Sequence, residues 1–391
     1  MVPARPRLGL AEVLRRHGPA YLASHPLSAA KARVWRAILA CRTAALGGHV
    51  QACDACGTMR HVYHSCRNRH CPLCQTRAKE AWLAARRREV LPVPYFHLVF
   101  TLPHDLNGLI GSNPRLLYET LFGAVSATLT EFAANPRWLG GTAAFSLVLH
   151  TWKQDLGRHV HIHALMAGGA LSATGDWNTA KQGFLFPVQA LSKVFRGKFI
   201  AALKQARDKG GLTEPVLADH AWRDLIARLY AHEWVVYAKQ PLAGPEQVLE
   251  YLGRYTHRVA ISNERIVGID EAGVALRVRA DATTGKKRTV RLKAGEFIDR
   301  FLMHVLPGGF KRIRHYGLLG PAAKAVKLAQ ARAALNAPVP DPLVVESVQA
   351  FMQRIEWQEY LRCPHCGEGQ FVPTAPIAPV RPRLMHLRGP P

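Results

Sequence analysis

The sequence lacks any long uncharged apolar run. None of its hydrophobic stretches approaches the roughly 18–20 residues that a membrane-spanning helix needs, although 48% of the 391 residues are hydrophobic. The N-terminus carries arginines but neither a long apolar segment nor a small-residue cleavage site, so we expect no secretory signal and a cytoplasmic protein. The phosphate-loop motif GxxxxGKS/T is also missing.

Acidic residues are scarce. The chain has 27 Asp and Glu against 52 Lys and Arg, a formal net charge of +25. Residues 1–90 alone hold sixteen basic residues and four acidic ones. Arginine enrichment in a GC-rich genome would explain part of this surplus, but in a folded protein its size indicates a polyanionic partner, which we expect to be nucleic acid. No segment reads as a basic amphipathic membrane helix, so a membrane partner is not expected.

Cysteines number only eight, and in a chain without a secretory signal they indicate metal ligands or reduced thiols rather than disulfides. Two CxxC pairs, Cys53 with Cys56 and Cys71 with Cys74, are separated by fourteen residues. This spacing predicts that the four thiolates converge on one tetrahedral zinc ion. A site with four protein ligands has no open position, so its role would be structural.

The remaining cysteines allow several interpretations. Cys66 could form a second zinc site with nearby histidines, or those groups could simply be surface residues beside Arg67 and Arg69 that face DNA. Cys363 and Cys366 make one isolated pair, which either completes a site with distant residues or a second chain or stays reduced. Cys41 reads as a buried helix residue.

The pattern of elements predicts an α+β fold with a largely antiparallel sheet. Residues 1–92 read as a helical zinc-binding domain with a cysteine-rich insert, ended by Pro92 and Pro94. Residues 93–320 mix strands and helices, and residues 321–391 form a helical extension with a proline-rich tail, 372–391, that we expect to be disordered. In the central part we expect strands at 96–102, 144–152, 159–166, 264–269, 273–279 and 287–292, and helices at 114–134, 189–208, 218–230, 245–259 and 295–304.

Three histidines alternate with apolar residues in the strand His159-Val160-His161-Ile162-His163. Alternation places the histidines on one face, while Ile162 packs on the other. Histidines two positions apart lie about 6.6–7 Å apart at the backbone, which lets both rings lean onto one cation. We favour the pair His161 and His163 as metal ligands over the pair that includes His159.

Two tyrosines stand one helical turn apart, at Tyr251 and Tyr255. A tyrosine hydroxyl can attack a DNA phosphate when a metal polarises that phosphate. Arg254, His257 and Arg258 would donate hydrogen bonds to neighbouring phosphates. Taken alone, this segment is better explained by a helical stripe of core packing residues.

Together, the two segments resemble the HUH superfamily of single-strand nucleases, and more closely the two-tyrosine transposases of rolling-circle bacterial insertion sequences (insertion-sequence family ninety-one). The resemblance covers about residues 30–320. It rests on the segments SCRNRHCPLC (65–74), FTLP (100–103), QDLGRHVHIHAL (154–165), YLGRYTHRVAIS (251–262) and GFKRIRHYGLL (309–319).

The resemblance implies that one DNA strand is cleaved through a 5′-phosphotyrosine link with a Mg²⁺ or Mn²⁺ ion, and that the DNA is single-stranded or a hairpin. It leaves the third metal ligand open among Gln154, Asp155 and Glu250. Alternative functions are a replication initiator or relaxase with the same chemistry, a non-catalytic zinc-containing DNA-binding regulator, and a metal-dependent hydrolase that uses water.

Overall fold

The computed structural model describes residues 8–181, 183–213, 217–238, 247–248, 253, 259–280, 284–341, 346–354 and 361–380. The chain forms two compact units. The larger unit, Ala78–Ile261 and Arg265–Asp341, is the catalytic candidate. The smaller unit joins both ends of the chain, Met1–Arg77 and Pro342–Pro391, with the short segment Ser262–Glu264.

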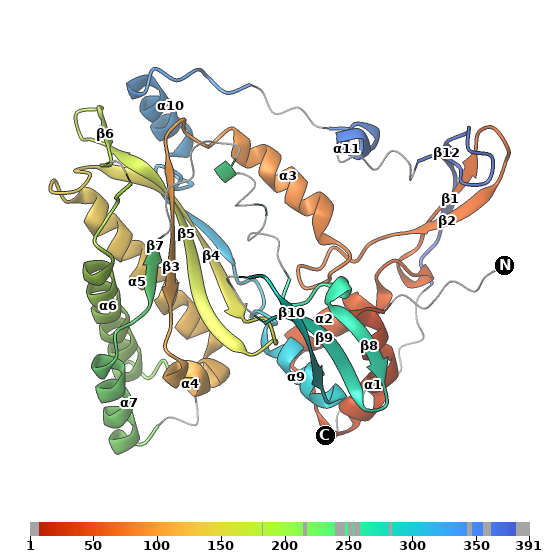
Figure 1. Ribbon diagram of the computed structural model, residues 1–391, viewed down its shortest axis with the longest axis horizontal. Helices are drawn as coiled ribbons and strands as arrows, with labels where there is room; N and C mark the ends of the chain where they lie inside the picture. The colour runs from red at the N-terminus through yellow and green to blue at the C-terminus, as the bar shows by residue number, and fades with distance from the viewer. Residues whose placement is uncertain are drawn as a thin grey trace. The chain divides into compact units, whose positions relative to one another are not determined.

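A mixed-length antiparallel sheet is the centre of the larger unit (Figure 1). Its strand order is β11-β4-β5-β3-β7, and β6 pairs with the end of β5. The strands are β3 (Tyr95–Thr101), β4 (Thr142–Trp152), β5 (Arg158–Leu171), β6 (Trp177–Thr179), β7 (Val236–Ala238) and β11 (Ile313–Gly317). The long hairpin β4–β5 therefore lies between β11 and β3, so each of its two strands is hydrogen-bonded to a neighbouring strand on both sides.

Helices cover one face of this sheet because that face is apolar along every central strand. Alternate residues of β4 and β5, among them Leu149 and Ile162, are fully buried there. Ile162 thus packs on the side predicted for it. Aromatic side chains from the helices, such as Phe122 and Phe195, complete the core. The covering helices are α4 (Asn107–Ser112), α5 (Pro114–Ala134), α6 (Val188–Asp208) and α7 (Asp219–Ala231) (Figure 1).

The opposite face of the sheet changes character along β5. Leu165 and Ala167 are buried in a second apolar cluster with side chains of α3 (Gln75–Arg87) and α10 (Lys324–Ala334). His161 and His163 continue the same face toward the start of the strand, because they precede Leu165 at steps of two residues. The apolar cover thus gives way to histidines on this face.

A small antiparallel sheet, β10-β9-β8, also belongs to the larger unit. Its inner face is apolar, with Val274, Leu276 and Val278 buried, and α9 packs against it. The bounds are β8 (Ile266–Asp270), β9 (Gly273–Arg279), β10 (Lys287–Leu292) and α9 (Ala294–Met303). The predicted strands and helix in this stretch are confirmed to within a few residues.

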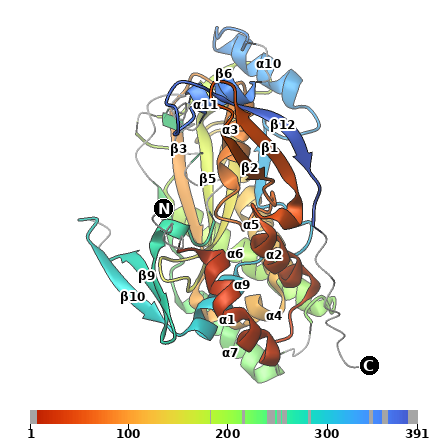
Figure 2. The same cartoon turned by 90° about the vertical axis from the view of Figure 1, so that its right-hand side faces the viewer.

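The smaller unit combines helices with a three-stranded sheet, β12-β1-β2. Figure 2 shows β12 beside β1, so that the two ends of the chain share one sheet. The prediction of disorder from residue 372 is wrong for residues 372–377, because these form a strand that pairs with β1. The elements are α1 (Leu10–Ser24), α2 (Ala29–Ala40), β1 (Gly48–Cys53), β2 (Met59–Tyr63), α11 (Val348–Arg354) and β12 (Phe371–Ile377).

The architecture confirms the predicted fold class: an antiparallel sheet flanked by helices, with a helical N-terminal region that carries cysteines. The sequence analysis missed the hairpin β1–β2 and the strand β11. Most of the helix expected at 245–259 lies outside the described residues. Within the described part of the chain, no helix is both long enough and apolar enough to cross a membrane.

Candidate active site and metal centres

Three histidines converge on the open face of the large sheet: His150 from β4, and His161 and His163 from β5. One ring nitrogen of each lies within 4.8 Å of the others. His150 is directly opposite His161 in the antiparallel register, and opposed residues of such a pair project from the same face. The predicted pair thus gains a third imidazole that the sequence analysis did not identify.

Hydrogen bonds fix which nitrogen of each β5 histidine faces the group. Nδ1 of His161 lies 3.0 Å from the carbonyl oxygen of His159, so it donates its proton there and leaves the Nε2 lone pair free. Nδ1 of His163 contacts Nε2 of His97 at 2.9 Å. The Nε2 atoms of His161 and His163 are consequently turned toward each other, 3.1 Å apart. Two nitrogens that share a cation at bond lengths of about 2.0–2.1 Å lie at such a separation.

The third ring is held by packing. His150 is only 3% exposed, and the indole of Trp152 stacks on it at 4.8 Å between ring centroids with an interplanar angle of 19°. The His150 ring meets that of His163 edge-on at 4.5 Å. A buried ring with two such neighbours has little rotational freedom, so its nitrogen is preorganised toward the pair on β5.

A cavity of about 240 Å³ opens on these histidines. Two basic residues, Lys153 and Arg265, line it together with Trp152 and Gln154. The Arg265 guanidinium donates to the backbone carbonyls of Gln154 and Arg277, which hold the side chain at the cavity. The cavity therefore combines nitrogen ligands with basic side chains, an arrangement that suits a phosphate group.

Of the candidates that the sequence offered for the third ligand, Asp155 has its contacts outside this group. Asp155 accepts a hydrogen bond from the Gly157 amide at 2.9 Å and forms ion pairs with Lys153 and Arg300. Gln154 lines the cavity but is outside the triad. The Nδ1 atom of His159 contacts His104 at 3.3 Å, and burial lowers the pKa of His159. Glu250 lies outside the described residues.

The predicted nucleophiles and their basic neighbours also fall outside the described residues: Tyr251, Arg254, Tyr255, His257 and Arg258. Val248 and Gly253 of the expected helix 245–259 are described. Val248 is completely buried in the cluster that contains Leu165 and Ala167 of β5. Gly253 lies against α3, because a methyl group added there would meet Leu83 at 3.0 Å.

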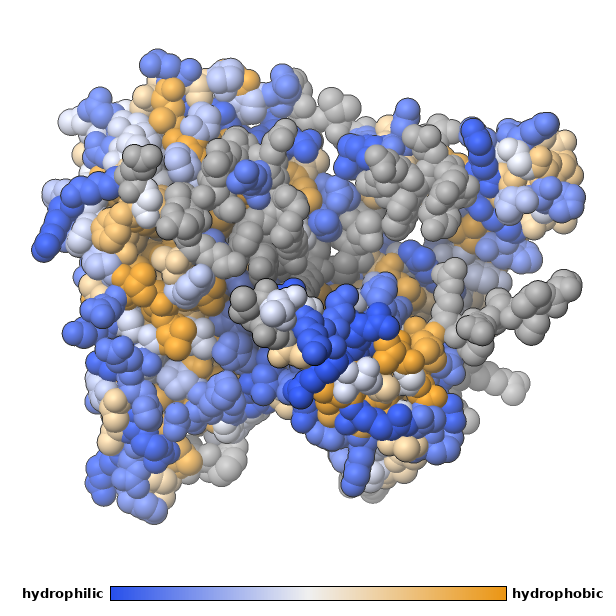
Figure 3. Space-filling view, viewed as in Figure 1, coloured by the Kyte–Doolittle hydropathy of each residue, from blue (hydrophilic) through white to orange (hydrophobic). Residues whose placement is uncertain are grey.

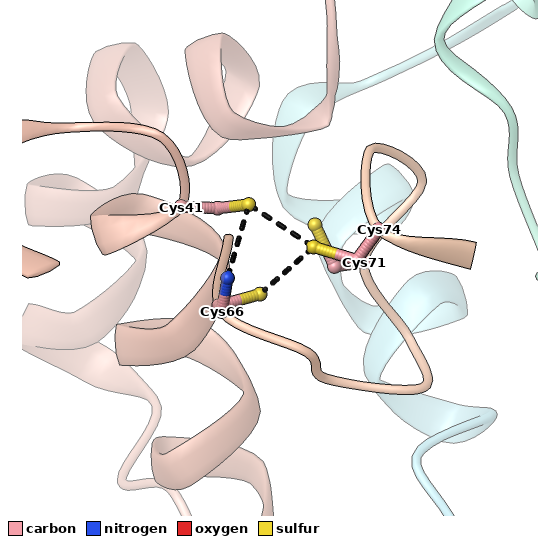
Figure 4. Close-up of side chains that lie close together, drawn as sticks. All are labelled: Cys41, Cys66, Cys71 and Cys74. Carbon is pink, nitrogen blue, oxygen red and sulfur yellow. Dashed lines mark hydrogen bonds between the residues drawn. The ribbon is translucent and has the colours of Figure 1, made fainter. Parts of the chain in front are cut away.

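The smaller unit contains two cysteine clusters. In the first, the thiols of Cys41, Cys66, Cys71 and Cys74 lie within 4.8 Å of one another (Figure 4). In the second, the thiols of Cys53, Cys56, Cys363 and Cys366 do the same. The predicted grouping of the two CxxC pairs in one site is therefore corrected: each pair belongs to a different cluster. The first is completed by Cys41, which was expected only as a buried helix residue, and by Cys66, which was considered for a second zinc site with histidines.

The four converging thiols of the first cluster suit a bound cation. Hydrogen bonds from Cys66 and Cys71 lower the pKa of Cys41 to about 2. The same contact with Cys41 raises the pKa of Cys66 to about 12, and that of Cys71 is raised as well. Four thiols this close cannot all ionise by themselves, whereas a coordinated metal ion deprotonates each of them. Cys41 and Cys71 are buried, as expected for a structural zinc site.

One thiol of the second cluster, that of Cys56, is accessible to solvent. Cys56 is exposed, and hydrogen bonds from Thr58, whose hydroxyl lies 3.2 Å from the sulfur, lower its pKa to about 6. Arg67 and Arg69 are exposed in the loop between Cys66 and Cys71, where the predicted contact with DNA remains a prediction.

Two protein families match this chain, and one of them is a zinc-binding domain. Residues 13–102 match a family described as "Transposase zinc-binding domain", and residues 144–327 match one described as "Putative transposase". A putative transposase of Sinorhizobium fredii is 46% identical over 373 residues, 93% of this chain and 94% of that protein. A transposase for insertion sequence element IS801 of Pseudomonas savastanoi pv. phaseolicola is 26% identical over 361 residues, 90% of this chain and 85% of that protein.

The second family match contains all three clustered histidines, and the first contains the complete cluster around Cys41. These matches and the 46% identity over nearly the whole length establish the relationship. The chain belongs to the transposases of bacterial insertion sequences, of insertion-sequence family ninety-one, with a zinc-binding domain in its N-terminal part.

Proposed function

We propose that this transposase cuts and rejoins single DNA strands, with Tyr251 and Tyr255 as nucleophiles and with a divalent metal ion held by His150, His161 and His163. The observation that carries the proposal is the convergence of three oriented imidazoles at a cavity that also presents Lys153 and Arg265. Such a site is suited to bind one phosphate of a nucleic acid.

The chemistry of the donor atoms limits which metal ion can bind. All three side chains offer nitrogen, whereas Mg²⁺ prefers oxygen ligands in octahedral geometry. A first-row transition ion such as Mn²⁺ fits three imidazoles better. When bound, the ion would polarise the phosphate and neutralise the charge that develops on it. The role of the protein is to hold the imidazoles in place through His97, Trp152 and the His159 carbonyl.

The proposed reaction is a transesterification. The tyrosine oxygen forms a bond to phosphorus, the bond from phosphorus to the 3′-oxygen breaks, and the phenol proton is balanced by the proton gained on the 3′-hydroxyl. The 5′-phosphate side of the DNA stays linked to the tyrosine. Because one ester replaces another, the reverse reaction can rejoin a strand without ATP. Two tyrosines would let one hold a cleaved end while the other cleaves again.

The described neighbours of the tyrosines support their assignment. Val248, three positions before Tyr251, is buried in the apolar cluster that contains Leu165 and Ala167, which share a sheet face with His161 and His163. Val248 therefore packs on the sheet face that carries the histidines. Tyr237 on β7 is an exposed tyrosine near this region, since its partner Val99 on β3 also pairs with His163.

A second surface is suited to bind the DNA backbone. The outer face of the β9–β10 pair carries Arg277, Arg279, Lys287 and Arg291, all exposed. Asp270 neutralises Arg291 in an ion pair, which leaves three basic side chains in adjacent register positions. Figure 3 shows hydrophilic surface over these strands. We propose that this basic face, defined as Arg277, Arg279 and Lys287, contacts phosphates. Because the proposed substrate is DNA inside a bacterial cell, we also propose that the enzyme acts in the cytoplasm.

Adduct formation on a 3′-labelled single-stranded oligonucleotide tests the proposal, since the label stays with the tyrosine-linked fragment. We expect the wild-type protein with Mn²⁺ to form a covalent adduct, and the Tyr251→Phe/Tyr255→Phe variant to bind the oligonucleotide without forming one. Tyr237→Phe is the matched control and should form the adduct normally.

Peptide mapping of the adduct distinguishes the alternatives. An adduct that persists in the double variant, or one mapped to Tyr237, would contradict the assignment. Nicking without any adduct would indicate a hydrolase that uses water. Binding with neither nicking nor adduct would favour a DNA-binding regulator.

A further inference from the structure

Two short turns in the smaller unit have the same structure, although one lies near each end of the chain. Both follow the pattern Cys-x-x-Cys-Gly: Cys53 to Gly57, and Cys363 to Gly367. In each, the glycine amide donates to the carbonyl of the first cysteine, at 3.0 Å in the N-terminal turn and 2.9 Å in the C-terminal one. Both glycines have positive φ, 70° and 75°, a conformation that other residues rarely adopt. The pair Cys71 and Cys74 is followed by Gln75 and lacks this turn.

The two turns face each other through their sulfur atoms. Sγ of Cys53 lies 3.7 Å from that of Cys366, and Sγ of Cys56 lies 3.8 Å from that of Cys363. Four sulfurs arranged tetrahedrally at zinc bond lengths of about 2.3 Å are separated by about 3.8 Å. A disulfide needs a sulfur separation of about 2.05 Å, and all four cysteines are free.

The surrounding backbone brings the turns together. Strand β1 ends at Cys53, which pairs with Phe371 at the start of β12. Beyond the strands, the Asp54 amide donates to the Gln370 carbonyl at 3.1 Å, and the Asp54 carboxylate accepts from the Gln370 amide at 2.8 Å. Gly369 allows the close approach, because a methyl group there would lie 2.4 Å from the Cys53 sulfur.

We propose that Cys53, Cys56, Cys363 and Cys366 bind a second structural zinc ion, separate from the one at Cys41, Cys66, Cys71 and Cys74. The ion would fasten β12 to the N-terminal hairpin and so build the zinc-binding unit from both ends of the chain. The matched zinc-binding family ends at residue 102 and contains only two of these ligands. Cys56 and Cys363 are 307 positions apart, and zinc binding would offset the entropic cost of closing this loop.

Zinc content of the full-length protein tests the proposal directly. The measurement uses a His161→Ala/His163→Ala background, so that zinc at the histidine site does not contribute, and it is independent of nicking activity. We expect two zinc ions per chain, and one after Cys363→Ser/Cys366→Ser. The matched pair Cys41→Ser/Cys66→Ser should also retain one. Unchanged zinc content in the Cys363→Ser/Cys366→Ser protein would overturn the proposal.

Thiol alkylation of the otherwise wild-type chain gives an answer that does not depend on the folding of cysteine variants. In the zinc-loaded protein, Cys363 and Cys366 should resist iodoacetamide, and chelation should expose them together with Cys53 and Cys56. Gly369→Ala keeps every ligand but crowds Cys53, and it should raise the alkylation rate of these four cysteines while leaving Cys41 protected. Rapid alkylation of Cys363 and Cys366 in the zinc-loaded protein would refute the second site.

Discussion

His150 on β4 lies directly across from His161 on β5, and their ring centroids are 5.5 Å apart in an edge-on arrangement. The candidate metal centre is therefore a property of the strand pair rather than of one strand. A slip of one residue in the β4–β5 register would turn His150 to the opposite face, where Leu149 and Ile162 are buried in the core. The apolar core thus fixes the geometry of the metal ligands.

The first prediction concerns His150 itself. We expect His150→Ala to abolish metal-dependent nicking of a single-stranded oligonucleotide while DNA binding remains, because binding depends on basic residues elsewhere. The matched control is His159→Ala, which removes a histidine of the same strand whose ring nitrogens are not among the three that converge. Gel-based nicking with Mn²⁺ measures both. Wild-type nicking by His150→Ala would remove this residue from the ligand set.

The second prediction follows from the chemistry of the three nitrogen donors. The wild-type protein should nick faster with Mn²⁺ than with Mg²⁺ at equal concentration. Replacing one nitrogen by oxygen in His150→Asp should shift the ratio of the two rates toward Mg²⁺. Rates measured across a concentration series of each ion give the ratio. An identical ratio in wild-type and variant proteins would mean that His150 does not contact the ion.

The third prediction separates positioning from ligation. His97 contacts Nδ1 of His163 at 2.9 Å but is not one of the three converging histidines. We expect His97→Phe to raise the Mn²⁺ concentration needed for half-maximal nicking by about 10–100-fold, as for other partners that orient a metal-bound histidine. Saturating Mn²⁺ should restore the rate, and His97→Gln, which keeps a hydrogen-bonding group, should be less affected. A lower rate at every Mn²⁺ concentration would contradict a positioning role.

The contrast between His150 and the β5 histidines shows what a single sequence can predict about this site. The pair His161 and His163 is visible because its period of two is local and unusual on an apolar strand. His150 stands alone on its strand, and its role arises only when the β4–β5 register is known. The polar turn between these strands is visible in the sequence, but it does not by itself determine the register. The signal available in the sequence was a single histidine on each of the two strands that flank β5: His97 on β3 and His150 on β4.

The cysteines illustrate the same limit. Each CxxC pair was correctly seen as a local unit, but spacing alone could not decide which pairs meet. Cys53 and Cys56 meet Cys363 and Cys366 because β1 pairs with β12, a contact between opposite ends of the chain. One sequence difference was informative: a glycine follows Cys56 and Cys366, whereas Gln75 follows Cys74. The two turns that end in glycine are the two whose cysteines meet in the second cluster.

The fourth prediction tests the basic face of β9 and β10. We expect Arg277→Ala/Arg279→Ala/Lys287→Ala to weaken binding to single-stranded DNA and to reduce the slope of log affinity against log salt by about 0.7 for each lost phosphate contact. The apolar side of the sheet is untouched, so the fold should persist. Arg137→Ala, which removes an exposed arginine after α5, is the control. An unchanged salt slope in the triple variant would exclude this face from the DNA interface.

The last prediction concerns stability and pH, and it rests on His304 at the end of α9. This ring is 2% exposed, with Nδ1 3.1 Å from the Thr151 hydroxyl and Nε2 donating to the Leu156 carbonyl at 2.8 Å. Burial lowers its pKa to about 4, from 6.5. The unfolded chain therefore takes up a proton first as the pH falls. The free energy of unfolding should decrease from about pH 6.5 to about pH 4 and lose no more from this residue below that range.

At pH 5 the difference between the folded and unfolded pKa of His304 corresponds to about 2 kcal/mol of lost stability. Urea unfolding of the wild-type protein and of His304→Gln at pH 7 and pH 5 measures it, with equal zinc in every sample. Glutamine does not titrate, so the variant is expected to be less stable at pH 7 but to lose about 2 kcal/mol less on acidification. The difference between the two proteins isolates His304, because every other titrating group is common to both. If wild-type and variant proteins lost equal stability between pH 7 and pH 5, His304 would have to be protonated as readily in the folded protein as in the unfolded chain, which its burial between Thr151 and Leu156 opposes.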